Sequence, residues 1–140
     1  MPFERVLVAI DGSDASNRAF AKALELVAAI RADLTALATE GPLPVYAATI
    51  AEVDEVKREK DAFFGGLADR AREQAAAAGV DLQVVVRAGH AAEVISMFAS
   101  EGGYDLIVLG HKGHFLRDHL LGSTADRVAE HATCPVMIVR

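Results

Sequence analysis

Hydrophobic residues along the chain form short continuous runs that alternate with longer stretches at helical spacing. Residues 6–10 are an unbroken run of β-branched and aliphatic side chains that stops at the turn residues Asp11 and Gly12. Such a run is typical of a strand buried on both faces of a sheet. From Phe20 to Ile30, apolar residues recur three or four positions apart, which indicates an amphipathic helix. A second apolar run at 34–39 follows, so the N-terminal part predicts strand, helix and strand, the beginning of a parallel sheet.

The same pattern continues to the C-terminus and predicts five strands separated by four helices. The expected strands cover residues 6–10, 34–39, 82–87, 106–109 and 135–139, and the expected helices cover residues 15–31, 50–78, the stretch from Gly89 to Gly102, and 123–132. Two prolines predict a loop at about 40–49. The glycine pair Gly65-Gly66 should weaken the second helix. Because no hairpin signal separates the strands, we expect an open, mostly parallel α/β sheet with helices on both faces.

Length and composition limit the classes of protein that fit. The chain has 140 residues, which suits a single domain spanning 1–140, and its formal net charge of -6 argues against broad nucleic-acid or membrane-surface binding. Cys134 is the single cysteine, so no intrachain disulfide can form and a reducing, cytoplasmic environment is expected. The N-terminal residues do not resemble a secretory signal, and no stretch approaches the ~20 apolar residues that span a bilayer.

Two segments at expected carboxyl ends of strands carry candidate chemistry. Asp11-Gly12-Ser13-Asp14 follows the first strand, and Gly110-His111-Lys112-Gly113 follows the fourth. The latter leads to Gly122-Ser123-Thr124, where a helix should begin with a Ser123/Asp126 capping box. Glycine amides and a helix N-terminus suit an anion, so these segments predict a phosphate cradle at the sheet's switch point. Neither a P-loop nor a G-x-G-x-x-G motif is present, and ordinary turns remain an alternative interpretation.

At these residues the sequence resembles the universal stress protein family in its small single-domain, nucleotide-binding form. The resemblance is carried by four segments, which are Arg5 to Ser13, Asp105 to Gly110, the glycine loop from Gly110 to Ser123, and Cys134 to Val139. It covers nearly the whole chain and is weakest between about 40 and 80. It implies a Rossmann-like three-layer fold, which we expect to have the strand order 3-2-1-4-5.

The nucleotide-binding branch of this family is described by the pattern G-x2-G-x9-G-(S/T). Here Gly110 and Gly113 fit the first part, but only eight residues separate Gly113 from Gly122, one fewer than in the pattern. A change of one residue in a loop costs little stability, whereas phosphate binding depends on accurate amide placement. Affinity or nucleotide preference can therefore differ from that of the family.

The resemblance implies a set of ligand-binding residues at the switch point. Gly110, Gly113, Gly122 and Ser123 would hold the ribose and phosphates of ATP, accompanied by Mg²⁺. Asp11 would lie beside the adenosine or a phosphate-bound cation, and Ala38 and Thr39 would offer backbone contacts to adenine. We add Thr124 as a second hydroxyl and Lys112 as a cation that neutralises phosphate charge.

Other reactive side chains have plainer interpretations. His111, His114, His119 and His131 are loosely spaced and lack a cysteine partner, so we expect surface histidines rather than a metal site, although the first two could flank a phosphate tail. Cys134 before Pro135 is expected to be a small buried side chain, not a nucleophile. No recognisable catalytic residues are assigned.

The sequence leaves several functional classes open. The leading hypothesis is an ATP-binding stress-response module that is not primarily a catalyst and hydrolyses ATP slowly at most. Alternatives are a universal stress protein that works through protein contacts without ATP, and an adenylate-forming ATP pyrophosphatase, for which 140 residues leave no substrate domain. A receiver-like domain is disfavoured because its phosphoacceptor aspartate and its lysine are missing. Since the family commonly dimerises through its last strand, we expect a homodimer there, together with an unidentified protein partner.

Overall fold

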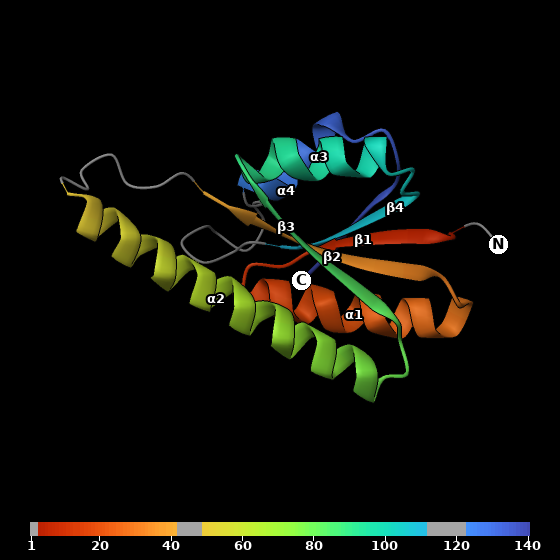
Figure 1. Ribbon diagram of the computed structural model, residues 1–140. Helices are drawn as coiled ribbons and strands as arrows, with labels where there is room; N and C mark the ends of the chain where they lie inside the picture. The colour runs from red at the N-terminus through yellow and green to blue at the C-terminus, as the bar shows by residue number, and fades with distance from the viewer. Residues whose placement is uncertain (1–2, 42–48, 112–122) are drawn as a thin grey trace.

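The computed structural model describes residues 3–41, 49–111 and 123–140, and it confirms the predicted alternation of strands and helices (Figure 1). Each predicted boundary lies within one or two residues of the observed one. The elements are, in chain order, β1 (Arg5–Ala9), α1 (Asp14–Ile30), β2 (Asp33–Glu40), α2 (Ile50–Ala77), β3 (Leu82–Ala88), α3 (Ala91–Glu101), β4 (Leu106–Gly110), α4 (Ser123–His131) and β5 (Val136–Val139).

The five strands form one parallel sheet in the order β3-β2-β1-β4-β5, as expected. Val6 of β1 lies opposite Leu34 of β2 on one side and Leu106 of β4 on the other. The chain therefore winds outward in both directions from β1. The point at which the strand order reverses lies between β1 and β4, where ligands of such sheets usually bind.

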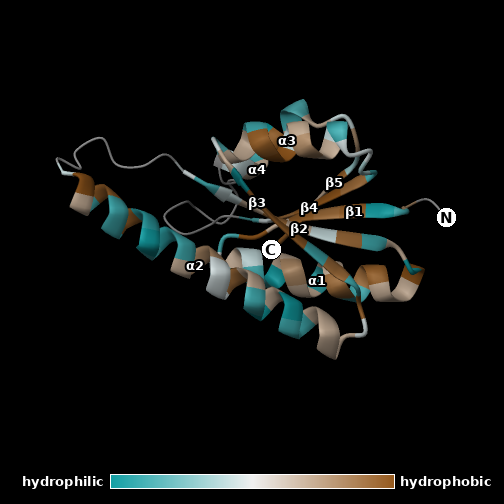
Figure 2. Ribbon diagram, in the orientation of Figure 1, coloured by the Kyte–Doolittle hydropathy of each residue, from teal (hydrophilic) through white to brown (hydrophobic). Residues whose placement is uncertain are grey.

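Helices cover both faces of the sheet and divide the core into two layers. In Figure 1, α1 and α2 lie below the sheet, and α3 and α4 lie above it. Val6 and Val8 belong to the layer with α1 and α2, whereas Leu7 belongs to the opposite layer, and all three side chains are fully buried. Burial on both faces explains the continuous apolar run of β1, and Figure 2 shows the hydrophobic strands at the centre of the molecule.

Helix α2 is long, and its two halves have different environments. The side chains of α2 that are buried all lie in the C-terminal half, from Leu67 to Ala75. The N-terminal half projects past the carboxyl edge of the sheet (Figure 1). The helix continues through Gly65 and Gly66, the positions at which the sequence predicted weakness. Within the described ranges, no helix combines the length and apolar character that crossing a membrane requires.

Candidate functional site

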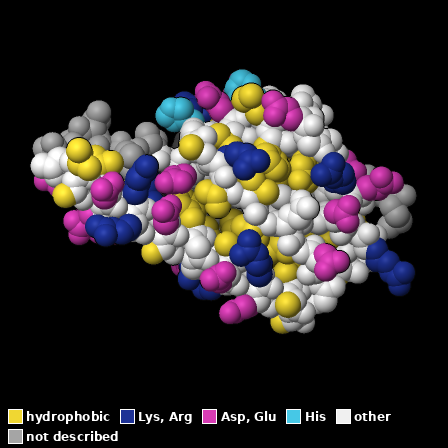
Figure 3. All heavy atoms as spheres, viewed as in Figure 1, with side chains coloured by type: hydrophobic (Ala, Val, Ile, Leu, Met, Phe, Trp, Pro, Cys, Tyr) yellow, Lys and Arg dark blue, Asp and Glu magenta, His cyan; other side chains and the backbone are white. Residues whose placement is uncertain are grey.

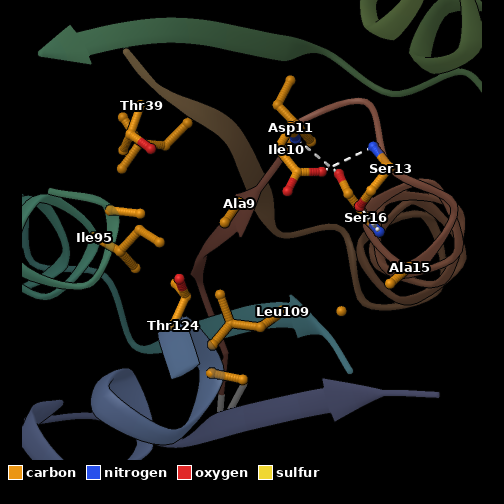
Figure 4. Close-up of a pocket in the computed structure, with 14 residues that line it drawn as sticks. Ala9, Ile10, Asp11, Ser13, Ala15, Ser16, Thr39, Ile95, Leu109 and Thr124 are labelled. Atoms are coloured by element: carbon orange, nitrogen blue, oxygen red, sulfur yellow. Dashed lines mark hydrogen bonds between the residues drawn. The ribbon is translucent and has the colours of Figure 1, made fainter. Parts of the chain in front are cut away.

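A cavity of about 230 Å³ opens at the carboxyl edge of the sheet, where β1 and β4 end side by side. It lies mainly on the α3 and α4 side and extends over the end of β1 to the start of α1 (Figure 4). The residues that line it come from six elements and the β1–α1 turn, and they are Ala9, Ile10, Asp11, Ser13, Ala15, Ser16, Leu37, Thr39, Ala91, Ile95, Leu109, Gly110, Thr124 and Ala125. The cavity therefore lies at the switch point of the sheet.

Four residues that the sequence singled out line this cavity together. Asp11, Thr39, Gly110 and Thr124 come from the ends of β1, β2 and β4 and from the first turn of α4. Ala38 lies next to Thr39 but is not among the lining residues, and its buried side chain packs in the opposite layer with α1 and α2. A contact from Ala38 to a ligand would have to come from its backbone, as the resemblance implies.

The remaining predicted residues belong to the glycine loop and to the first position of α4. Lys112, Gly113 and Gly122 lie outside the described residues. Ser123 is the first residue of α4 and precedes Thr124, which lines the cavity. The structure thus brings together the parts of the predicted cradle that it describes.

The turn after β1 is held in shape by hydrogen bonds between polar side chains and the backbone (Figure 4). Oδ1 of Asp11 accepts a hydrogen bond from the N–H of Ser13 at 2.8 Å, which forms an Asx turn. The Oγ of the buried Ser16 accepts from the N–H of Asp11 at 2.9 Å, and the Oγ of Ser13 accepts from the N–H of Ser16 at 3.2 Å. Ser13 is thereby the N-cap of α1. Asp11 is both a turn residue and a residue of the cavity.

Gly110 allows β4 to approach the start of α1 closely. A Cβ atom at this position would lie 2.5 Å from the backbone oxygen of Ala15. That distance is far too short for real atoms, so the first turn of α1 requires a glycine at the end of β4. The close approach brings the N-terminus of α1 to the rim of the cavity.

Three helices begin at the cavity. The first turn of α1 contributes Ala15 and Ser16, α3 contributes its first residue Ala91, and α4 contributes Thr124 and Ala125. A helix N-terminus has backbone N–H groups without intrahelical partners and carries a partial positive charge. Three such ends at one edge favour an anionic group there.

The apolar wall of the cavity was not predicted from the sequence. Leu37, Ile95 and Leu109 form this wall, and each side chain is almost completely buried. A weak signal was available, because Leu37 and Leu109 stand near the ends of predicted strands and Ile95 is on the predicted buried face of its helix. Their convergence depends on which helix covers which face, which periodicity alone does not determine.

The predicted histidines and the cysteine do not form a metal cluster within the described ranges. The expectation of a surface histidine is wrong for His111, which is buried directly after β4, and its Nε2 atom has no hydrogen-bond partner among the described residues. His114 and His119 lie outside those residues. Cys134 is half-buried against the α3 and α4 layer, and burial, reinforced by the negative charge of Asp105, raises the pKa of its thiol. This environment agrees with the prediction of a structural cysteine.

Comparison with known proteins places the chain in one family. A profile described as "Universal stress protein family" matches residues 2–140. The universal stress protein YxiE of Bacillus subtilis is 33% identical over 147 aligned positions, which cover 99% of both chains. Among solved structures, the universal stress protein UspA from Lactobacillus plantarum is 28% identical with a TM-score of 0.84 and covers 99% of this chain and 98% of its own.

A second solved structure is a universal stress protein in complex with cAMP. It is 29% identical, has a TM-score of 0.79, and is aligned over 100% of this chain and 99% of its own. The family profile and the relative from Bacillus both extend over nearly the whole sequence. The chain belongs to the universal stress protein family.

Proposed function

We propose that this protein binds an adenine nucleotide in the cavity between β1 and β4 and acts as a ligand-controlled stress-response module. The observation that carries the proposal is the convergence of Asp11, Thr39, Gly110 and Thr124 on one cavity. The relative in complex with cAMP supports it, since that protein is aligned over the whole length of this chain.

The two sides of the cavity suit the two parts of a nucleotide. Leu37, Ile95 and Leu109 offer an apolar surface for the base and the carbon face of the ribose. Asp11 and Thr124, together with the starts of three helices, offer polar partners for ribose hydroxyls and phosphate oxygens. Since the described cavity is about 230 Å³ and typical ligand pockets measure roughly 300–1,000 Å³, it encloses only part of a nucleotide.

The finer proposal is ATP with Mg²⁺ as the ligand. Gly110, Gly113, Gly122 and Ser123 retain the residue types of the family's phosphate-binding pattern, and Lys112 adds a cation in the same loop. Asp11 is a hard oxygen donor at the cavity, so it fits one ligand position of Mg²⁺ while phosphates and water supply the others. Because one loop residue is missing, AMP or cAMP competes with ATP as the preferred ligand.

We propose a binding role rather than a catalytic one. Among the described lining residues, Asp11 is the one side chain that ionises. Nucleophilic or general acid–base catalysis needs a reacting group, a base and an orienting partner in contact with each other. A ligand that binds without reacting can shift the equilibrium between two conformations or between two assembly states of the protein. The module would transmit its signal by such a shift.

The assembly that responds is proposed to be a homodimer through β5 in the cytoplasm. β5 is an edge strand, and its side chains from Val136 to Val139 are all partly exposed. An exposed edge offers unpaired backbone groups to a second chain. The cavity residue Gly110 lies opposite Val139 of β5, so ligand binding and this edge are close enough to influence each other.

Titration calorimetry of the purified protein with cAMP, AMP, ATP and ATP plus Mg²⁺ tests the proposal. We expect micromolar binding of at least one nucleotide and weaker binding by about tenfold or more in Thr124→Val, because a hydrogen bond to a charged group contributes about 1.5–3 kcal/mol. Thr133→Val is the matched control, since Thr133 is exposed in the bend before β5, at the amino ends of the strands and away from the cavity. Unmeasurable binding of all four ligands at millimolar concentration would contradict the proposal and favour a module that works through protein contacts alone.

A further inference from the structure

The other edge of the sheet is formed by β3, whose one strand neighbour is β2. Leu82, Val84, Val85 and Val86 are partly exposed along this strand, and Arg87 is exposed at its end. β3 lies at the front of the molecule in Figure 1, and the space-filling view of the same side shows a hydrophobic patch there, bordered by charged side chains (Figure 3). An exposed apolar edge of this kind favours pairing with another strand.

Two hydrogen bonds determine which backbone groups of β3 point outward. The N–H of Gly89 donates to the carbonyl of Glu40 at the end of β2 at 3.0 Å, so the odd-numbered residues direct their polar backbone groups toward β2. The carbonyl of Val86 accepts instead from Nη1 of its neighbour Arg87 at 3.2 Å, which agrees with an outward direction. By the alternation of the strand, Leu82, Val84 and Val86 present N–H and C=O groups to the outside.

When two copies of β3 run antiparallel, the charged and apolar residues of one copy can lie opposite matching residues of the other. Asp81 precedes β3 and Arg87 stands near its end, with the apolar residues between them. Neither side chain belongs to an ion pair of the described structure. If two copies meet antiparallel with Val84 opposite Val84, each Asp81 lies opposite an Arg87, and each Leu82 lies opposite a Val86.

We propose that β3 pairs antiparallel with β3 of a second copy of this chain, with a two-fold axis at Val84. The two five-stranded sheets would then form one continuous sheet. Outward-facing residues lie opposite each other in this register, as an antiparallel ladder requires. A register centred on Val85 also satisfies the ladder but places Gln83 opposite Arg87 and leaves Asp81 opposite Gly89. Charge complementarity therefore selects the register centred on Val84.

Arg87 must change partners when the pair forms. In the single chain its guanidinium lies 5.6 Å from the ring centre of Phe98 and donates to the carbonyl of Val86. Pairing directs this carbonyl to the N–H of Leu82 in the other copy and brings the guanidinium to the other copy's Asp81. Because the ion pairs lie at an exposed edge, salt screens them, and we expect reversible association that weakens as ionic strength rises.

Disulfide trapping tests the register directly, in the full-length chain with Cys134→Ala so that no other thiol competes. Val84→Cys should form an intermolecular disulfide under mild oxidation, because two residues paired at the axis have Cα atoms about 5.5 Å apart, within the range for a disulfide. Val86→Cys is the matched control: its two copies would be offset by four residues, about 14 Å, and should not link. Circular dichroism of both variants verifies folding.

Linking of Val86→Cys as readily as Val84→Cys, or of neither, would overturn the proposal. Association through β5 alone leaves Val84→Cys unlinked, so this readout distinguishes the two edges. It is also independent of nucleotide binding.

Sedimentation equilibrium of charge variants provides a second test. Asp81→Arg or Arg87→Asp alone should weaken self-association about fivefold or more, because like charges then face each other. The double variant Asp81→Arg with Arg87→Asp should restore it, since the pairs re-form with exchanged signs. If the folded double variant does not regain self-association, the Asp81–Arg87 pairing is contradicted. Binding of a foreign extended peptide at β3 in place of a second copy would also contradict the proposal.

Discussion

Gly110 combines an observed packing role with a proposed role in ligand binding. The sequence pattern assigned it to phosphate recognition, and the structure adds the close approach of β4 to the backbone oxygen of Ala15. Any side chain there displaces the first turn of α1, and this turn carries Ser16, whose hydroxyl holds the backbone of Asp11. The geometry of the candidate site and the stability of the fold therefore both depend on this residue.

We expect Gly110→Ala to reduce the free energy of unfolding by about 1–3 kcal/mol, as overpacking against a rigid neighbour does. Chemical denaturation measures the change. Gly41→Ala is the control, because no atom of the described residues lies within 4 Å of a Cβ at that position and the free energy of unfolding should stay nearly constant. A Gly110→Ala protein as stable as the parent would show that α1 can shift at little energetic cost and that the close contact does not affect stability.

Cys134 gives a prediction about reactivity. Burial and the charge of Asp105 raise the pKa of its thiol, so less thiolate is present near neutral pH than for an ordinary cysteine. Alkylation by iodoacetamide should be slower in the folded protein than in the urea-unfolded chain, and its pH profile should be displaced to higher pH. Since the unfolded thiol loses its proton first, this group favours folding below the unfolded pKa and loses that effect as pH rises through the folded pKa. Equal alkylation rates in both states would contradict this account.

At the scale of elements, α2 is the one whose stability the sequence predicted least well. The glycine pair suggested a weak point, yet the helix is continuous. Helical hydrogen bonding and the burial of the C-terminal half outweigh the entropic cost of two glycines. Replacing one of these glycines should therefore stabilise the protein.

Gly65→Ala should raise the free energy of unfolding by about 0.5–1 kcal/mol, because a Cβ there meets no atom within 4 Å in the part of the chain that the structure describes. Gly79→Ala is the contrasting variant. Its φ of +71° suits glycine, so alanine should destabilise the turn after α2. Thermal unfolding followed by circular dichroism compares the two, and destabilisation by Gly65→Ala would indicate that α2 is locally distorted.

The elements themselves were largely predictable, for physical reasons visible in particular residues. Val6, Leu7 and Val8 form a continuous apolar run because both faces of β1 are covered, and Ser13 marks the start of α1 because its hydroxyl caps the helix. The site was predictable in part. Asp11, Thr39, Gly110 and Thr124 follow from motif and strand ends, whereas the apolar wall around Ile95 depends on tertiary packing.

At the scale of the whole molecule, the parallel sheet explains why residues far apart in the chain share one cavity. All five strands end at the same edge, and α1, α3 and α4 begin at the cavity there. The formal net charge of -6 repels a phosphate at long range, so local groups must provide the attraction. Three helix starts at the cavity, together with the proposed contribution of Lys112, supply that attraction in our account.

The most direct test of the account is hydrogen exchange measured by mass spectrometry with and without saturating adenine nucleotide. We expect slower exchange at the β1–α1 turn, at the end of β4 and at the start of α4, with β3 and the C-terminal half of α2 unchanged. Protection confined to other surfaces, or exchange unaffected by any adenine nucleotide, would contradict the claim that this edge of the sheet is the nucleotide site.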